Sequence, residues 1–486
     1  MAADLAMSDS SGSWWSRPSG GRELSRVAAP LVISSLSWTV MTFVDRMMLN
    51  WVSGTAMSGA FSGSMVWFVV VCLPLGIAMY ANTFIAQYFG SNQKERIGLA
   101  VWQAVGIAVG FAPLMLATIP LAPTIFSYAG HDSAVLAVEI EYFQILCVGA
   151  PGMLIAQAAA SFYSGRGETW VVMWVDAAAA LLNLVLDYLW IFGYAGFPAW
   201  GVAGAAWATT LSLWVKAVVY VLLPLQRAHR AEYDTLGGLR FDWELVRRML
   251  YFGGPSGLQM VLDVVGFTVF VLLIGRLGAV PRDATTMAFS VSSMAFMPIW
   301  GLSSAVGILV GQHLGENRDR LAARVTYTGL QLAWLYMAGI STLYVFVPGL
   351  FLHGFTAETA AGAAESAAVY VLAVTLLRFV AAYNLLDATF MIFVSAIKGA
   401  GDTVFVLRVS LVLAVLLAGL SYLSVEVWDV GIYGCWVLVT GWVWLAAVTF
   451  YLRFRQGKWR AMRVIEGAAA ETYANDSTEA FVAGAK

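Results

Sequence analysis

The stretch TWVVMWVDAAAALLNLVLDYLWIFG, residues 169–193, decides the fold of this chain. At about 1.5 Å per residue it is long enough to cross the roughly 30 Å hydrocarbon core of a bilayer as one helix. Asn183 and Asp187 lie four positions apart within it and so share one helix face. Lipid tolerates a carboxylate at such a depth only where it faces a protected interior. The stretch therefore predicts a membrane-spanning helix that carries part of a functional site.

The composition places the whole chain in a membrane. Of its 486 residues, 60% are hydrophobic and 12% are charged, whereas a soluble domain carries roughly 25% charge. The excess apolar side chains must face lipid, which predicts a polytopic membrane protein. The formal net charge of -2 argues against a nucleic-acid partner. All three cysteines lie in apolar stretches, where they are expected to be small core residues.

Apolar runs of spanning length predict about twelve transmembrane helices and an all-α fold. The basic residues gather in the links on one side of these spans and at both ends of the chain. The positive-inside rule makes that side cytoplasmic, so we expect a plasma membrane protein, in a bacterium an inner-membrane one, with both termini inside. The predicted spans are residues 27–50, 58–88, 97–121, 135–163, 169–193, 199–223, 247–277, 284–313, 322–347, 369–397, 404–426 and 430–452.

The longest polar link divides the spans into two sets of six. This predicts an N-lobe over residues 23–225, a cytoplasmic linker at 226–246 and a C-lobe over 247–455. Residues 1–22 are predicted to be a disordered cytoplasmic tail, and 456–486 a cytoplasmic tail that is disordered from about residue 464. Residues 453–463, with Trp459, either rest on the anionic inner leaflet or form an ordinary basic flank of the last span.

Short matches between the two halves indicate an internal repeat. Residues 86–92 match 311–317, and Pro30 matches Pro255 at the same offset of 225 positions. Residues 165–169 and 201–204 match 399–403 and 431–434 in the same chain order. Six spans restore the orientation of the chain, so the repeat is parallel and its pseudo-axis runs along the membrane normal. Transporters built in this way place their substrate between two pseudo-symmetric six-helix lobes.

Several stretches resemble those of the multidrug and toxic compound extrusion family, of the NorM type. They are TFVDR at 42–46, AQYFG at 86–90, NLVLDY at 183–188 with Gly193, GVAGAAWAT at 201–209, GPSGLQ at 254–259 and KGAGDT at 398–403. The resemblance extends over about residues 22–455. It implies a twelve-helix protein of two lobes that exports drugs in exchange for Na⁺ or H⁺. We expect a monomer with no cofactor beyond that coupling ion.

Four polar residues of the N-lobe are expected at a similar depth. Asp45 and Asp187 each lie eighteen residues into an outward-running span, about 27 Å along the helix. The span after the one with Asp187, residues 199–223, runs inward and places Thr209 at a comparable depth in the membrane. Carboxylate, amide and hydroxyl oxygens suit Na⁺, and because burial and like charge both disfavour two ionised carboxylates, H⁺ can compete for the same group. The resemblance assigns this role to Asp45, Asn183, Asp187 and Thr209.

Plainer roles stay open for three of these residues. Asp45 could pair with the adjacent Arg46 near the outer interface. Asp187 could make a structural hydrogen bond between helices, and Thr209 could serve helix packing alone.

The C-lobe carries a second set of candidate residues. Asp263 lies mid-span in the seventh helix, and Tyr383 lies one turn before Asp387 in the tenth. This pattern resembles a cation site of NorM-type members, although Asp263 is one methylene shorter than the Glu expected there. The alternative is a buried, neutral, hydrogen-bonded acid.

We compared three classes of function. A secondary-active antiporter fits the buried acids. A flippase for a lipid-linked saccharide is the alternative, but pyrophosphate would require basic groups in the cavity, where the deep charges are mainly acidic. An enzyme would need a nucleophile–base pair or a metal cluster, and neither pattern is present in the sequence.

Overall fold

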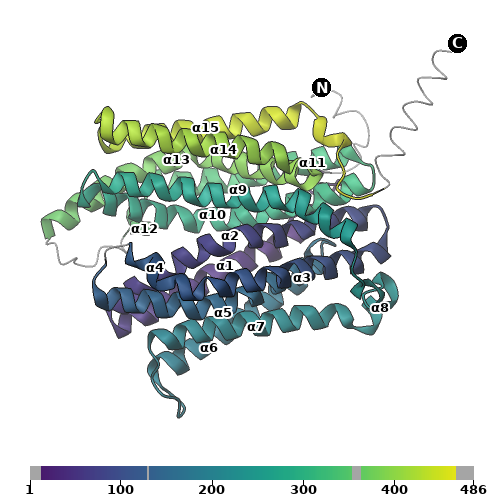
Figure 1. Cartoon of the computed structure of the whole chain (residues 1–486). Coiled ribbons are helices and arrows are strands. Elements are labelled where there is room, and N and C mark those ends of the chain that lie inside the picture. The colour runs from purple at the N-terminus through teal and green to yellow at the C-terminus, as the bar shows by residue number, and fades with distance from the viewer. Residues whose placement is uncertain (1–12, 129–130, 353–362, 467–486) are drawn as a thin grey trace. The chain divides into compact units, whose positions relative to one another are not determined.

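The computed structural model describes residues 13–128, 131–352 and 363–466, and this part of the chain contains helices but no β-strand (Figure 1). The first eight helices are α1 (Gly21–Val52), α2 (Gly54–Gly90), α3 (Lys94–Ala117), α4 (Ala122–Ser127), α5 (Ser133–Ser164), α6 (Thr169–Phe192), α7 (Val202–Leu222) and α8 (Arg227–Tyr233). The others are α9 (Trp243–Gly275), α10 (Ala279–Gly315), α11 (Asp319–Phe346), α12 (Gly349–Leu352), α13 (Ala363–Ala400), α14 (Thr403–Tyr422) and α15 (Gly431–Arg455).

Twelve of the described helices are long and apolar enough to cross a membrane, which confirms the predicted spans. Each predicted span overlaps one observed helix, and the ends differ by a few residues. Large apolar side chains such as Phe43, Leu335 and Val415 are exposed on the helix surfaces. A soluble protein rarely exposes so many, so these side chains face lipid.

The turn between α6 and α7 illustrates how the sequence sets helix ends. Gly193 ends α6 in the left-handed region at φ 75°, and its backbone N–H donates to the carbonyl of Leu189. Glycine adopts this conformation without a steric penalty from a Cβ atom. Its place at the end of α6 reverses the chain into α7, so the polar faces of the two helices can meet.

The contacts divide the chain into two compact units. The N-unit is built on residues 33–261, with 315–317 and the described residues from Arg463 onwards. The C-unit is built on 262–314 and 318–462, with the described residues before Ile33. The division therefore falls inside α1 and α9, and it differs from the predicted boundary at the 226–246 link. The sequence pattern assigned each helix whole to one lobe, whereas tertiary contacts can divide a long helix.

The N-unit is centred on α5, which packs against α2, α3 and α7. Phe143 and Phe162 of α5 are fully buried. In the same unit, small residues allow α2 and α9 to approach each other closely. A Cβ atom on Gly76 of α2 would lie 2.5 Å from the Cα of Gly257 in α9. Membrane helices approach closely through small residues of this kind.

The C-unit is centred on α13, which packs against α11 and α15. Its largest cluster of buried apolar side chains includes Phe393, Phe450 and Trp459. The Trp459 ring stacks on that of Phe454 at 4.6 Å, and its Nε1 donates to the Phe454 carbonyl. The Trp459 ring is therefore buried inside the protein, and it is not the part of residues 453–463 that could meet a lipid leaflet.

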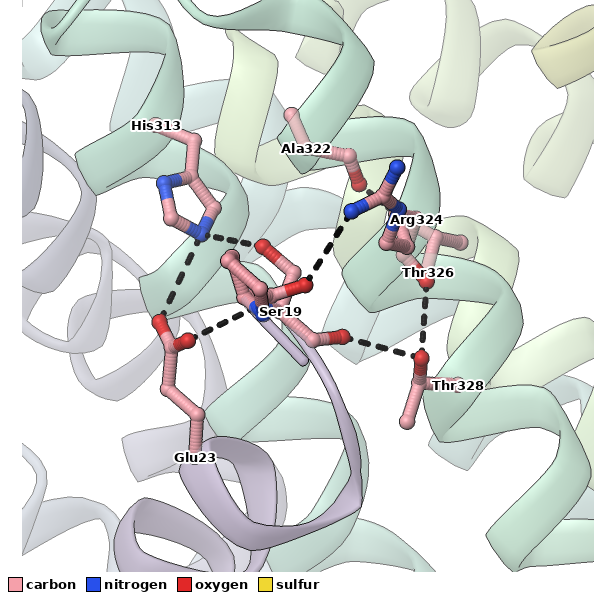
Figure 2. A network of polar contacts seen from close by, with 8 residues as sticks. Ser19, Glu23, His313, Ala322, Arg324, Thr326 and Thr328 are labelled. Atoms are coloured by element: carbon pink, nitrogen blue, oxygen red, sulfur yellow. Dashed lines mark hydrogen bonds and ion pairs between the residues drawn. The ribbon is translucent and has the colours of Figure 1, made fainter. Parts of the chain in front are cut away.

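The prediction of a disordered N-terminal tail over residues 1–22 is wrong for its described part. Residues 13–20 form hydrogen-bonded turns, and Gly21 already belongs to α1. Ser19 is fully buried, and Figure 2 shows it between α10 and α11 of the C-unit. Its hydroxyl lies 2.9 Å from His313 Nε2, and its carbonyl accepts from the Thr328 hydroxyl at 3.0 Å. Residues 1–12 lie outside the described part of the chain.

The start of the C-terminal tail is also anchored, here in the N-unit. The Val464 backbone N–H donates to Gln87 Oε1 at 2.8 Å, and Glu466 forms an ion pair with Arg96 at 3.1 Å. Val464 and Ile465 are buried. Disorder predicted from about residue 464 is thus wrong for residues 464–466, and residues 467–486 lie outside the described part.

The 226–246 link is folded onto the N-unit. It contains α8 and a short 3-10 helix, Gly237–Leu239, and both pack against α3. Trp102 and Gln103 of α3 donate to backbone carbonyls of the link at 2.6 and 2.7 Å.

Candidate functional site

Asp45 lies in the interior of the N-unit. It is 7% exposed on α1, and the Tyr142 hydroxyl of α5 donates to its Oδ2 at 3.2 Å. Oδ1 of the same carboxylate is buried without a hydrogen-bond partner among the described residues. The neighbouring Arg46 places its guanidinium 4.8 Å from the centre of the Phe61 ring. Arg46 interacts with Asp45 electrostatically, but the hydrogen bond to Asp45 comes from Tyr142.

Asp187, Asn183 and Thr209 form a connected polar group between α6 and α7. Asn183 and Asp187 are fully buried. In the orientation that satisfies the Asn183 amide, Nδ2 donates to Asp187 Oδ2 at 3.1 Å and Oδ1 accepts from the Thr209 hydroxyl at 3.3 Å. One turn separates Asn183 from Asp187 on α6, so both side chains point toward the same neighbour.

The two groups belong to one cluster. Asp45 and Asp187 interact electrostatically, and Tyr142 interacts with both. Asp187 Oδ1, like Asp45 Oδ1, is buried without a hydrogen-bond partner in the described part of the chain. The structure thus brings all four predicted N-lobe residues into the interior of a single unit. A buried carboxylate oxygen without a donor is costly, and a cation or a proton would satisfy it.

Sequence analysis missed Tyr142 and the pair of Asp176 and Lys216. Lys216 Nζ of α7 lies 2.7 Å from Asp176 Oδ1 of α6. Asp176 lies seven positions before Asn183, two helical turns on the same face, and this spacing could have revealed it. Tyr142 gave no such signal, because a single tyrosine in an apolar span is common at helix interfaces.

The C-lobe candidates are only partly brought together. In the C-unit, Tyr383 of α13 is buried, hydrogen-bonds to Ser292 and interacts electrostatically with Asp387 one turn further on. Asp263 of α9 instead interacts electrostatically with Lys398. The structure therefore shows electrostatic interactions of Tyr383 with Asp387 and of Asp263 with Lys398.

Comparison with known families accounts for both halves of the chain. The sequence model named MatE matches residues 30–189 and again residues 255–423. The chain belongs to the MatE family. The two matches begin at Pro30 and Pro255, the pair that the internal repeat aligns, so the repeat consists of two copies of one domain. Members of the MatE family are membrane transporters, and this chain is a multi-pass membrane transporter rather than an enzyme.

Relatives within the family are similar over nearly the full length. The chain is 25% identical over 450 residues to a probable multidrug resistance protein NorM of Thermotoga maritima, covering 91% of this chain and 94% of that one. It is also 25% identical to a probable multidrug resistance protein NorM of Shewanella oneidensis, covering 89% and 94%.

Solved structures of MATE transporters share the fold. One is an outward-facing multidrug resistance MATE transporter, with a TM-score of 0.81, 19% identity and coverage of 90% of this chain and 96% of that one. Another is a eukaryotic MATE transporter, with a TM-score of 0.81, 18% identity and coverage of 93% and 98%. At this identity the likeness shows the fold alone.

Proposed function

We propose that the protein is a monomeric secondary-active efflux antiporter that exports amphipathic, often cationic, compounds in exchange for Na⁺ or H⁺ by alternating access. The observation that carries the proposal is the buried cluster of Asp45, Tyr142, Asn183, Asp187 and Thr209. Its two carboxylates each keep one buried oxygen without a hydrogen-bond partner in the described part of the chain. Relatives named as multidrug resistance proteins support the substrate class.

The cluster fits reversible cation binding for an electrostatic reason. Two carboxylates that interact in a buried setting repel each other when both are ionised, and burial adds to the penalty. A bound Na⁺ or H⁺ removes most of this penalty, so its binding can shift the population between two conformations of the transporter. Inward movement of one positive charge supplies about 2.3 kcal/mol per 100 mV of membrane potential. That energy, together with the ion gradient, drives export.

The flippase alternative is less well supported. A pyrophosphate headgroup needs unpaired basic groups in the interior, and in the N-unit the Lys216 ammonium is engaged by Asp176 at 2.7 Å.

The proposal is tested by uptake of ethidium into inverted vesicles, with a Na⁺ gradient and a pH gradient imposed separately. The wild type should accumulate the dye under at least one gradient. Asp187→Asn should lower gradient-driven uptake by about tenfold or more, because a neutral amide cannot take up a proton and lacks the negative charge that holds Na⁺. Asp429→Asn, at an exposed position between α14 and α15, is the matched control and should transport normally. Dye uptake indifferent to both gradients would rule out antiport.

A further inference from the structure

A second charged group lies in the N-unit, nearer the start of α6 than the cluster described above. Asp176 Oδ1 accepts from Lys216 Nζ at 2.7 Å and from the Tyr220 hydroxyl at 2.9 Å. Its Oδ2 accepts from the Ser34 hydroxyl of α1. Asp176 lies seven residues from the start of α6, whereas Asp187 lies eighteen, so the two carboxylates are roughly 16 Å apart along the helix.

Two facing stripes connect this group to the cluster. On α6, Asp176, Ala180, Asn183 and Asp187 follow one another at spacings of three or four residues, which places them on one face. On α7, Thr209, Ser212 and Lys216 do the same. The helices α6 and α7 pack against each other, and the stripes consist of polar and small side chains.

A cavity lies between the stripes. Its lining includes Thr209 of the cluster at one end and both Asp176 and Lys216 at the other. The volume open to the centres of water molecules is about 40 Å³, enough for more than one water, since a single water needs roughly 10–15 Å³. The Ser212 hydroxyl also lines it, is 4% exposed as a residue, and has no hydrogen-bond partner in the described part of the chain.

The cavity wall is mostly apolar, but Ser212, Thr209, Asp176 and Lys216 place polar groups around it, so water can occupy it. A buried hydroxyl without a partner costs free energy unless water or an ion satisfies it. Ser212, Thr209 and Asp176 offer several polar atoms to such an occupant. The cavity thus has the room and the chemistry for water between the cluster and the Asp176–Lys216 pair.

We propose that this cavity is an inner binding site for the coupling monovalent cation. In this proposal the Lys216 ammonium takes the place of that cation and forms the ion pair with Asp176 when the coupling cation is absent. The proposal rests on the antiport function proposed above. A cation that leaves Asp187 crosses the hydrated cavity and binds the Asp176 carboxylate in place of the ammonium. When the cation departs, Lys216 returns, so Asp176 keeps one positive partner throughout. If the cation is a proton, it forms an O–H bond on Asp176 and breaks that bond on leaving.

The test removes both charges together. Asp176→Asn with Lys216→Met leaves neither charge unpaired, so a merely structural ion pair should be dispensable in the double variant. We expect the double variant to reach the membrane but to lose gradient-driven ethidium uptake by about tenfold or more, since cation exchange then lacks its inner site. Wild-type uptake by the double variant, under the gradient that drives the wild type, would overturn the inference and leave the antiport proposal intact. A wild type that ignores both gradients would instead overturn the antiport proposal.

A second pair of variants covers the case in which the double variant does not fold. Ser212→Leu fills the cavity and keeps Asp176 and Lys216, whereas Val218→Leu adds bulk at an exposed position of the same helix, away from the cavity, and serves as the matched control. Leucine at position 212 should reduce gradient-driven uptake by about tenfold, and leucine at position 218 should keep most of it. Radiolytic hydroxyl-radical labelling of Met41, a buried lining residue, reports the water directly. Labelling of Met41 should fall in Ser212→Leu. Equal uptake and equal labelling in the two variants would contradict a hydrated inner site.

Discussion

The Tyr142 hydroxyl ties α5 to the acidic cluster. It donates to Asp45 at 3.2 Å and interacts electrostatically with both Asp45 and Asp187. A hydroxyl in this place can stabilise the ionised form of Asp45 and can also contribute an oxygen to a bound cation. Tyr142 therefore belongs to the cluster as fully as the residues that the resemblance singled out.

Removing this hydroxyl should destabilise the cluster, while the ring at position 142 still fills the same volume. Tyr142→Phe leaves Asp45 with a buried acceptor that has lost its donor, which costs about 1–3 kcal/mol. We expect a lower melting temperature in detergent and slower gradient-driven ethidium transport. The matched control is Tyr433→Phe, because Tyr433 is exposed on α15. Equal effects of the two substitutions would show that Tyr142 has no special part in the cluster.

A second residue-scale prediction concerns pH and lies outside the membrane spans. Burial, and then the nearby Arg166 guanidinium, hold the pKa of His229 on α8 below its ordinary value. The unfolded chain therefore binds more protons than the folded one as the pH falls through about 6.5, and folding stability decreases there. Its ring nitrogen Nε2 lies 3.2 Å from the Tyr163 hydroxyl, so the neutral ring has a partner to keep.

The comparison of wild type with His229→Gln isolates this effect. The melting temperature of the wild type should fall more steeply between pH 7.5 and pH 5 than that of the variant, because glutamine does not titrate. Superimposable pH profiles would contradict a depressed pKa at His229.

At the scale of helices, close approach between α2 and α9 depends on glycine. A Cβ atom on Gly257 would lie 2.3 Å from the Leu73 carbonyl oxygen, whereas one on Gly253 would have its nearest neighbour, in Ile77, at 3.4 Å, an ordinary van der Waals distance. Both glycines lie in the same helix, so the intrinsic helix preference of alanine is the same at the two sites. Only the packing differs.

The two alanine substitutions should change the free energy of unfolding in opposite directions. Gly253→Ala should stabilise the protein by about 0.5–1 kcal/mol, because alanine loses less backbone entropy than glycine. Gly257→Ala should destabilise it by about 1–3 kcal/mol, because the backbone of α2 must move away. Thermal unfolding of the two purified variants measures the difference. Equal shifts would mean that the two helices are not held this closely.

At the scale of the whole molecule, the distribution of basic residues predicts the orientation of the protein in the membrane. The three cysteines are free and buried, so an added cysteine should be the main target of a membrane-impermeant maleimide. Tyr128, between α4 and α5, is 87% exposed, and Leu239, in the 226–246 link, is 57% exposed. The positive-inside rule places the first outside the cell and the second inside.

Labelling should separate the two positions. Tyr128→Cys should react in intact cells, and Leu239→Cys only in inverted vesicles. The wild type should remain unlabelled in both and is the control for the native cysteines. The reverse pattern would invert the predicted topology.

The sequence by itself determined the twelve spans and the internal repeat, because apolar length and repeated motifs are local properties that do not depend on how helices pack. It also indicated Asp45, Asn183, Asp187 and Thr209, since a polar group in an apolar span is visible without coordinates. Only the tertiary structure decided which partners these groups meet. Tyr142 joins them from another helix, and Asp263 interacts electrostatically with Lys398. Such contacts depend on how each helix is rotated about its axis and packed against its neighbours. An apolar sequence pattern predicts that a helix spans the membrane, but it does not predict this rotation.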